Sequence, residues 1–160
     1  MVLRVYHAAA SRRRAFRVVG LFAVLGCAHR SPVPVQSFEG KIDVRSATMR
    51  ADLLTVRYGP EETLVRARIT NTSDGPLVVS LGASLLENDG LEYAPTEVGN
   101  RPVGASSAVV VELTYVLRRR LGSEATLVLR GVQNSAGFLE PLRLRIPPAA
   151  PTSPQSGTAP

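Results

Sequence analysis

The residues that could carry acid–base, nucleophilic or metal chemistry are few. The sequence holds two histidines, His7 and His29, and one cysteine, Cys27. Because no histidine follows residue 29, the rest of the chain cannot assemble a Ser-His-Asp or Cys-His site. It also lacks the ligands of a zinc or copper centre and a Gly-rich phosphate loop. We therefore expect a protein that is not an enzyme and that holds no cofactor.

Carboxylates offer the remaining chemistry. Glu87, Asp89 and Glu92 surround the turn 88–90, where their oxygens could bind Ca²⁺. Their spacing differs from the regular spacing of a calcium loop, so we expect a solvated hairpin tip without a metal. A calcium-binding protein or a carboxylate-dependent enzyme is the alternative that the sequence leaves open.

Three consecutive arginines, Arg118, Arg119 and Arg120, form the one concentrated charge after residue 27. A guanidinium group binds phosphate through two parallel hydrogen bonds. The triplet therefore predicts an anion-binding site for anionic lipid, lipopolysaccharide or an acidic partner. The alternative is a solvated loop between two strands, since apolar residues flank the triplet on both sides.

The single cysteine follows a short apolar run. Arg12–Arg14 and Arg17 form a positively charged segment, and Val18–Leu25 is an apolar stretch interrupted only by a glycine. Gly26 then precedes Cys27. This order of charged, apolar and small residues is typical of a secretory signal peptide, and the run falls short of the ~20 residues of a membrane span. We predict that residues 1–26 are a signal peptide and that the protein is exported.

The stretch Val24-Leu25-Gly26-Cys27 resembles the lipobox of bacterial lipoproteins. The resemblance implies cleavage before Cys27 and attachment of fatty acyl groups such as palmitate to this residue, which anchor the protein in a membrane. Acylation would also consume a thiol that has no disulfide partner in an oxidising compartment. Ala28 in place of Asp implies the outer membrane, facing the periplasm. Residues 13–16 resemble part of a twin-arginine signal, so the export route stays open.

The positive charge of the chain belongs mainly to this leader. Five of the 19 basic residues and none of the acidic ones precede Cys27, which leaves 14 basic residues against 13 acidic ones. A net charge near +1 provides no field that would attract a polyanion. We therefore expect no nucleic-acid partner.

Composition divides the remainder into three parts. Residues 27–37 comprise the cysteine and a Pro-containing segment that predicts an extended tether. Residues 147–160 contain only small residues, polar residues and prolines, which predicts a disordered tail. Residues 38–146 are long enough for one domain of ordinary size.

Within this domain the apolar residues recur with a period of two. Val65, Ala67 and Ile69 alternate with Arg66, Arg68 and Thr70, as in a half-buried strand. Turn residues separate such segments at intervals typical of an antiparallel β-sandwich of about 7–9 strands, with a small barrel as the alternative. The candidate strands are residues 38–45, 53–58, 64–70, 77–81, 83–87, 91–94, 108–116, 125–132 and 141–146.

Residues 64–132, with their Asn-Thr-Ser-Asp-Gly-Pro turn and their "VVVELTYVL" strand, resemble an immunoglobulin-like domain family found in bacterial lipoproteins and secreted proteins. The resemblance implies an immunoglobulin-like sandwich and brings no catalytic residues. We therefore expect an interaction module that binds an envelope protein through an edge strand or loops, without a small-molecule substrate.

Overall fold

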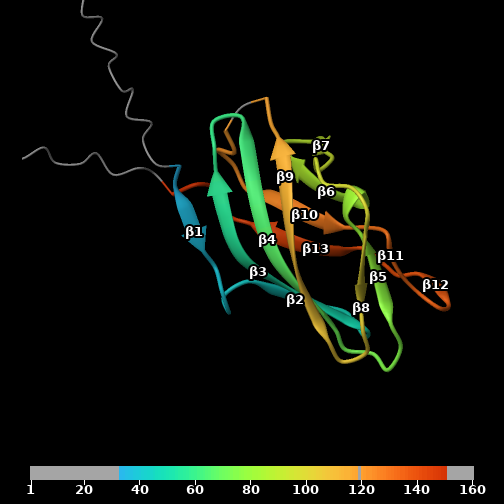
Figure 1. The fold of residues 1–160 in the computed structure, drawn as a ribbon. Coiled ribbons are helices and arrows are strands. Elements are labelled where there is room, and N and C mark those ends of the chain that lie inside the picture. The colour runs from blue at the N-terminus through green and yellow to red at the C-terminus, as the bar shows by residue number, and fades with distance from the viewer. Residues whose placement is uncertain (1–32, 119, 151–160) are drawn as a thin grey trace, which may run out of the picture. The chain divides into compact units, whose positions relative to one another are not determined.

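The computed structural model describes residues 33–118 and 120–150 (Figure 1). This part of the chain contains strands and one short 3₁₀ turn, η1 (Leu81–Ala83), and no α-helix. The all-β, antiparallel fold predicted from the sequence is confirmed. The strands are β1 (Val35–Ser37), β2 (Asp43–Arg45), β3 (Met49–Tyr58), β4 (Glu62–Asn71), β5 (Leu77–Ser80), β6 (Ser84–Asn88), β7 (Leu91–Tyr93), β8 (Asn100–Val103), β9 (Ala108–Val116), β10 (Ala125–Leu129), β11 (Val132–Asn134), β12 (Gly137–Phe138) and β13 (Leu142–Ile146).

The first layer is a sheet built on three long strands, in the order β3, β4, β9, with β1 and β2 both paired to the outer edge of β3. All of its pairs are antiparallel. The register of β3 on β4 shifts between Leu53 and Thr55, which places the consecutive leucines 53 and 54 both in buried positions. Such a bulge bends the strand and increases its twist.

The second layer consists of two four-stranded sheets, β13-β10-β6-β7 and β12-β11-β5-β8. The chain passes from one sheet to the other at two neighbouring bends. One bend is η1, between β5 and β6, and the other is the pair Arg130-Gly131, between β10 and β11. Gly131 has a φ of +69°, and a Cβ atom there would lie 2.8 Å from the Cβ of Ala83. Only glycine fits this close approach of the two bends.

The core lies between the layers, as Figure 1 shows for β3, β4 and β9 in front of β10 and β13. The predicted inward residues Val65, Ala67 and Ile69 are fully buried, as are their ladder partners on β3, which are Val56, Leu53 and Ala51. Tyr115 of β9 joins the layers directly, because its Oη donates a hydrogen bond of 2.9 Å to the Ser84 carbonyl. Among the residues that the structure describes, those of the buried core lie between Met49 and Ile146.

Several boundaries differ from the predictions. Of the candidate strand 38–45 only β2 is a strand, since a turn with Gly40 at φ +72° precedes it. Residues 125–132 form two strands in different sheets instead of one. β1 lies in the segment expected to be tether, and β8 and β12 lie outside every candidate strand. The start of the predicted tail contacts the domain, because Tyr58 Oη donates to the Pro147 carbonyl at 2.7 Å.

Candidate functional site

One end of the molecule gathers three connections that hold the predicted site residues. They are the β3–β4 turn (59–61), the β6–β7 turn (89–90) and residues 117–124 between β9 and β10. The Leu117 N–H donates to the Glu61 carbonyl at 2.7 Å. Asn88 Nδ2 donates to Ser123 Oγ at 2.7 Å. These two bonds tie the three connections together, and we call this part of the domain the loop end.

The loop end presents the predicted anion-binding arginines between two buried anchors. Leu117 and Leu121 are 5% and 1% exposed, so they fix both sides of the turn in the core. The side chains of Arg118 and Arg120 are exposed between them. Arg119 lies outside the described residues. The structure therefore holds two of the three predicted arginines on a pinned loop, where they face solvent.

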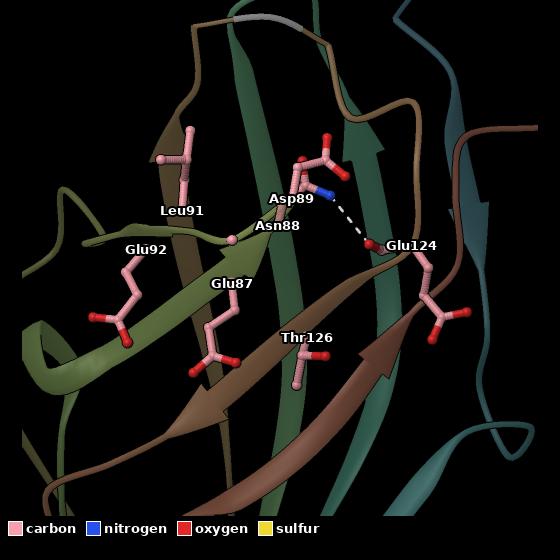
Figure 2. Close-up of a pocket in the computed structure, with 8 residues that line it drawn as sticks. Glu87, Asn88, Asp89, Leu91, Glu92, Glu124 and Thr126 are labelled. Carbon is pink, nitrogen blue, oxygen red and sulfur yellow. Dashed lines mark hydrogen bonds between the residues drawn. The ribbon is translucent and has the colours of Figure 1, made fainter.

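The predicted carboxylate cluster lines a pocket beside this loop (Figure 2). Glu87 on β6 lies opposite Thr126 on β10, and Glu92 follows on β7. Their partners could not be predicted from the sequence, because they are two arginines far along the chain, one in the bend after β10 and one on β13. Glu87 binds Arg143 Nη1 at 2.7 Å and Arg130 Nη2 at 3.3 Å, and Glu92 binds Arg130 Nη2 at 3.0 Å.

These ion pairs leave the cluster unsuited to calcium. Ca²⁺ needs several oxygen ligands directed at one point, whereas Glu87 and Glu92 are directed at guanidinium groups. Asp89 sits at φ 50° and Gly90 at φ 75°, the left-handed pair of a type I′ hairpin turn. Ser123 Oγ donates to Asp89 Oδ1 at 2.8 Å. Across residues 33–118 and 120–150, no group of three or more carboxylate, histidine or cysteine side chains could hold a metal ion.

Apolar side chains border the loop end on the side of β1. Val33, Val35 and Val116 are 39%, 61% and 63% exposed. Val33 and Val116 line a second pocket together with residues 59–62 of the β3–β4 turn. These valines gave no signal in the sequence, because exposure of β1 and of the end of β9 depends on which strands cover them.

The outer edge of β9 is only partly covered. Near its end, Thr96 N–H donates to the Thr114 carbonyl at 2.8 Å, and Thr114 N–H donates to Glu97 Oε2 at 2.6 Å. Partial burial disfavours the Glu97 carboxylate, but hydrogen bonds from Thr114, from Thr96 and from the backbone of Glu97 together outweigh burial and lower the pKa of Glu97. Burial, and secondly the charge of Glu97, raise the pKa of Tyr115. Among the described strands, β9 pairs only with β4, so its other edge is open from Ala108 to Glu112.

The predicted lipidation site, Cys27, and the signal peptide lie outside the described residues. Within the described ranges no helix is long and apolar enough to cross a membrane.

Comparison with known proteins finds similar folds among solved structures. No protein-family model matches the sequence, and no curated protein matches it. The crystal structure of ycdA from Bacillus subtilis, itself proposed to be a lipoprotein, has a TM-score of 0.55 and 14% identity over 66% of this chain and 38% of ycdA. The yjhA protein from Bacillus subtilis has a TM-score of 0.45 and 11% identity over 55% of this chain and 76% of yjhA.

These matches bear on the fold alone. The chain spans less than half the length of ycdA, and the two sequences share few identical residues. The lipobox and the immunoglobulin-like family therefore stay predictions. What the likeness to ycdA shows is that this chain belongs to an antiparallel β-architecture also found in that protein.

Proposed function

We propose that this protein is a lipid-anchored protein of the bacterial cell envelope whose β-domain is a non-catalytic interaction module. The observation that carries the proposal is the place of Cys27, directly after a cluster of arginines and a short apolar run. The shared fold with ycdA, which is itself proposed to be a lipoprotein, supports it. Ala28 after the cysteine favours the outer membrane, with the domain in the periplasm.

The anchor accounts for the chemistry of the first part of the chain. Each buried CH₂ of an acyl chain contributes about 0.8 kcal/mol, so several chains on one residue hold a protein that a single chain would release. The apolar run before Cys27 would be lost with the signal peptide. The domain needs no membrane-spanning element of its own in this arrangement.

The open edge of β9 supports the interaction role. The N–H and C=O groups of successive strand residues point to alternate edges. Thr114 bonds to Thr96 and Glu97 at the outer edge, so the even-numbered residues of β9 direct these groups there. Val110 lies on the open part of the edge and is 43% exposed. An unpaired edge with an exposed apolar residue is the feature to which a partner strand adds.

A pair of substitutions tests this role. Val110→Pro removes the edge N–H without breaking the ladder to β4, whereas Val110→Thr keeps the N–H. Cross-linking in intact cells should join the wild type and the Thr variant to the same envelope protein, and the Pro variant should lose this product. Identical products from all three proteins would contradict the proposed use of β9.

The anchor is tested by washing membranes with high salt and alkali. We expect the wild type to stay with the membrane fraction and Cys27→Ser to leave it. Release of both proteins by the wash would contradict a lipid anchor.

A further inference from the structure

We propose that the loop end lies against an anionic bilayer surface, with Arg118 and Arg120 bound to lipid phosphates. The inference deepens the proposed function, because the anchor would hold this end of the domain at the membrane. It goes beyond the anchor in assigning an orientation to the domain and a ligand to the arginine loop.

The place where the N-terminal segment joins the domain fixes which end is nearest the anchor. The Tyr58 N–H donates to the Pro34 carbonyl at 3.1 Å, and Val35 pairs with Arg57. These contacts put the start of the described chain beside the β3–β4 turn, which belongs to the loop end (Figure 1). Cys27 precedes Val33 by six residues, which span at most about 20 Å.

The side chains at this end match the layers of a bilayer surface. Arg118 and Arg120 are exposed, and a guanidinium group binds a phosphodiester through two parallel hydrogen bonds. Val33, Val35 and Val116 are exposed on the same end, where they can enter the region between headgroups and acyl chains. Leu117 and Leu121 are buried, so both flanks of the arginine loop are already fixed in the core before binding.

Acidic residues also lie at the loop end, and two of them are bound in ion pairs. Glu62 is already paired with Arg57 at 3.0 Å. Glu124 is paired with Arg145. Glu61 is exposed at the turn, and it is the main opposing charge on the side of the valines. Asp89 of the β6–β7 turn accepts a hydrogen bond from Ser123 Oγ and is a further acidic group of the loop end. A preference for an anionic lipid surface over a neutral one therefore comes from the two exposed guanidinium groups, not from a net positive charge of the loop end.

Vesicle binding of the chain from residue 28 to residue 160 tests the inference without the lipid. This chain contains all core residues of the described ranges and the whole of the second compact unit, so we expect it to fold. We expect it to bind vesicles of phosphatidylglycerol and phosphatidylcholine in equal parts, and to bind pure phosphatidylcholine far more weakly. Each arginine near an anionic surface contributes about fivefold, so Arg118→Ser/Arg120→Ser should lower the partition coefficient about 30-fold.

Two further variants serve as controls. Arg45→Ser/Arg101→Ser removes the same charge from exposed arginines of β2 and β8, away from the loop end, and should change binding less than threefold. Arg118→Lys/Arg120→Lys keeps the charge but loses the two parallel hydrogen bonds of each guanidinium group, so its binding should lie between that of the wild type and that of the Ser variant. Far-ultraviolet circular dichroism checks that every variant is folded.

The inference is overturned if the chain binds both kinds of vesicle equally, or if the loop variant and the control variant lose binding to the same extent. Loss of a protein cross-link in the loop variant, with vesicle binding unchanged, would instead assign the arginines to an acidic protein and also overturn it. Either failure leaves the lipid anchor standing, because this chain carries no lipid. Conversely, if Cys27 were found unmodified, the lipid anchor would be contradicted, and the vesicle-binding result would be unaffected.

Discussion

Replacing Asn71 with alanine should destabilise the domain more than any other single change in a turn. The side chain is fully buried at the end of β4. Its Nδ2 donates to the carbonyls of Gly75, Val103 and Gly104 at 2.7, 3.2 and 3.0 Å. Its Oδ1 accepts from the N–H and the Oγ of Ser73 at 2.9 and 2.7 Å. One amide thus closes its own turn and joins it to the loop after β8.

The cost follows from these partners. The NH₂ group has two hydrogens for three acceptors, so about four full hydrogen bonds are lost, each worth about 1 kcal/mol net. Water can bond to the groups on the exposed side of the turn, which recovers part of this free energy. We expect Asn71→Ala to lower the free energy of unfolding by about 3 kcal/mol, a large share of the 5–15 kcal/mol of a typical domain.

Urea unfolding followed by far-ultraviolet circular dichroism measures the effect, since the slope against urea should stay constant while the midpoint falls. Asn134→Ala is the matched control. Asn134 Oδ1 accepts a single bond from the Ala136 N–H at 2.8 Å, so its loss should cost about 1 kcal/mol or less. Equal losses for the two variants, or a loss below about 1 kcal/mol for Asn71→Ala, would refute this account of the turn.

Three further predictions concern stability. Gly131→Ala should cost about 2 kcal/mol by urea unfolding, because its new Cβ would clash with Ala83 at a positive φ. Burial raises the pKa of Tyr58 to about 12, so its contribution is complete below pH ~10 and is lost as the pH rises from ~10 to ~12. The melting temperature of Tyr58→Phe should therefore fall less steeply with rising pH than that of the wild type. The pKa of Glu97 is lowered, so stability is lost as the pH falls below ~4.5, and Glu97→Gln should show less of this acid loss.

Each of these predictions has an outcome that contradicts it. Gly75→Ala is the control for the glycine, because nothing lies within 4 Å of its added Cβ, and an equal loss there would exclude the close approach as the cause. Identical alkaline curves for the wild type and Tyr58→Phe would show that burial of this phenol does not matter. If Glu97→Gln lost as much stability at acid pH as the wild type, the bond to Thr114 would not depend on the carboxylate charge.

Strands β4, β9 and β13 could be predicted because their apolar residues alternate, whereas β3 begins four residues before its candidate range 53–58. β4, β9 and β13 fall within one or two residues of their predicted ranges. β8 gave no such signal, since three of its four residues are exposed and one is Pro102. The break between β10 and β11 depends on contact between Gly131 and Ala83, and such a contact between distant residues has no local pattern.

The candidate site could likewise be predicted only where its residues are neighbours in sequence. The arginine triplet and the turn carboxylates are neighbours in sequence, so their grouping could be predicted from local spacing. The pairing of Glu87 with Arg130 and Arg143 joins residues 43 and 56 positions apart, and it depends on the order of strands in the sheet. The exposed valines beside the β3–β4 turn depend likewise on where β1 pairs.

The intact mass of the protein extracted from bacterial membranes shows whether Cys27 carries a lipid anchor. If Cys27 is lipidated, the mass is that of a chain beginning at Cys27 plus the fatty acyl groups on that residue. A mass equal to unmodified residues 1–160, or a shortened chain with a free thiol at residue 27, would contradict the lipid anchor.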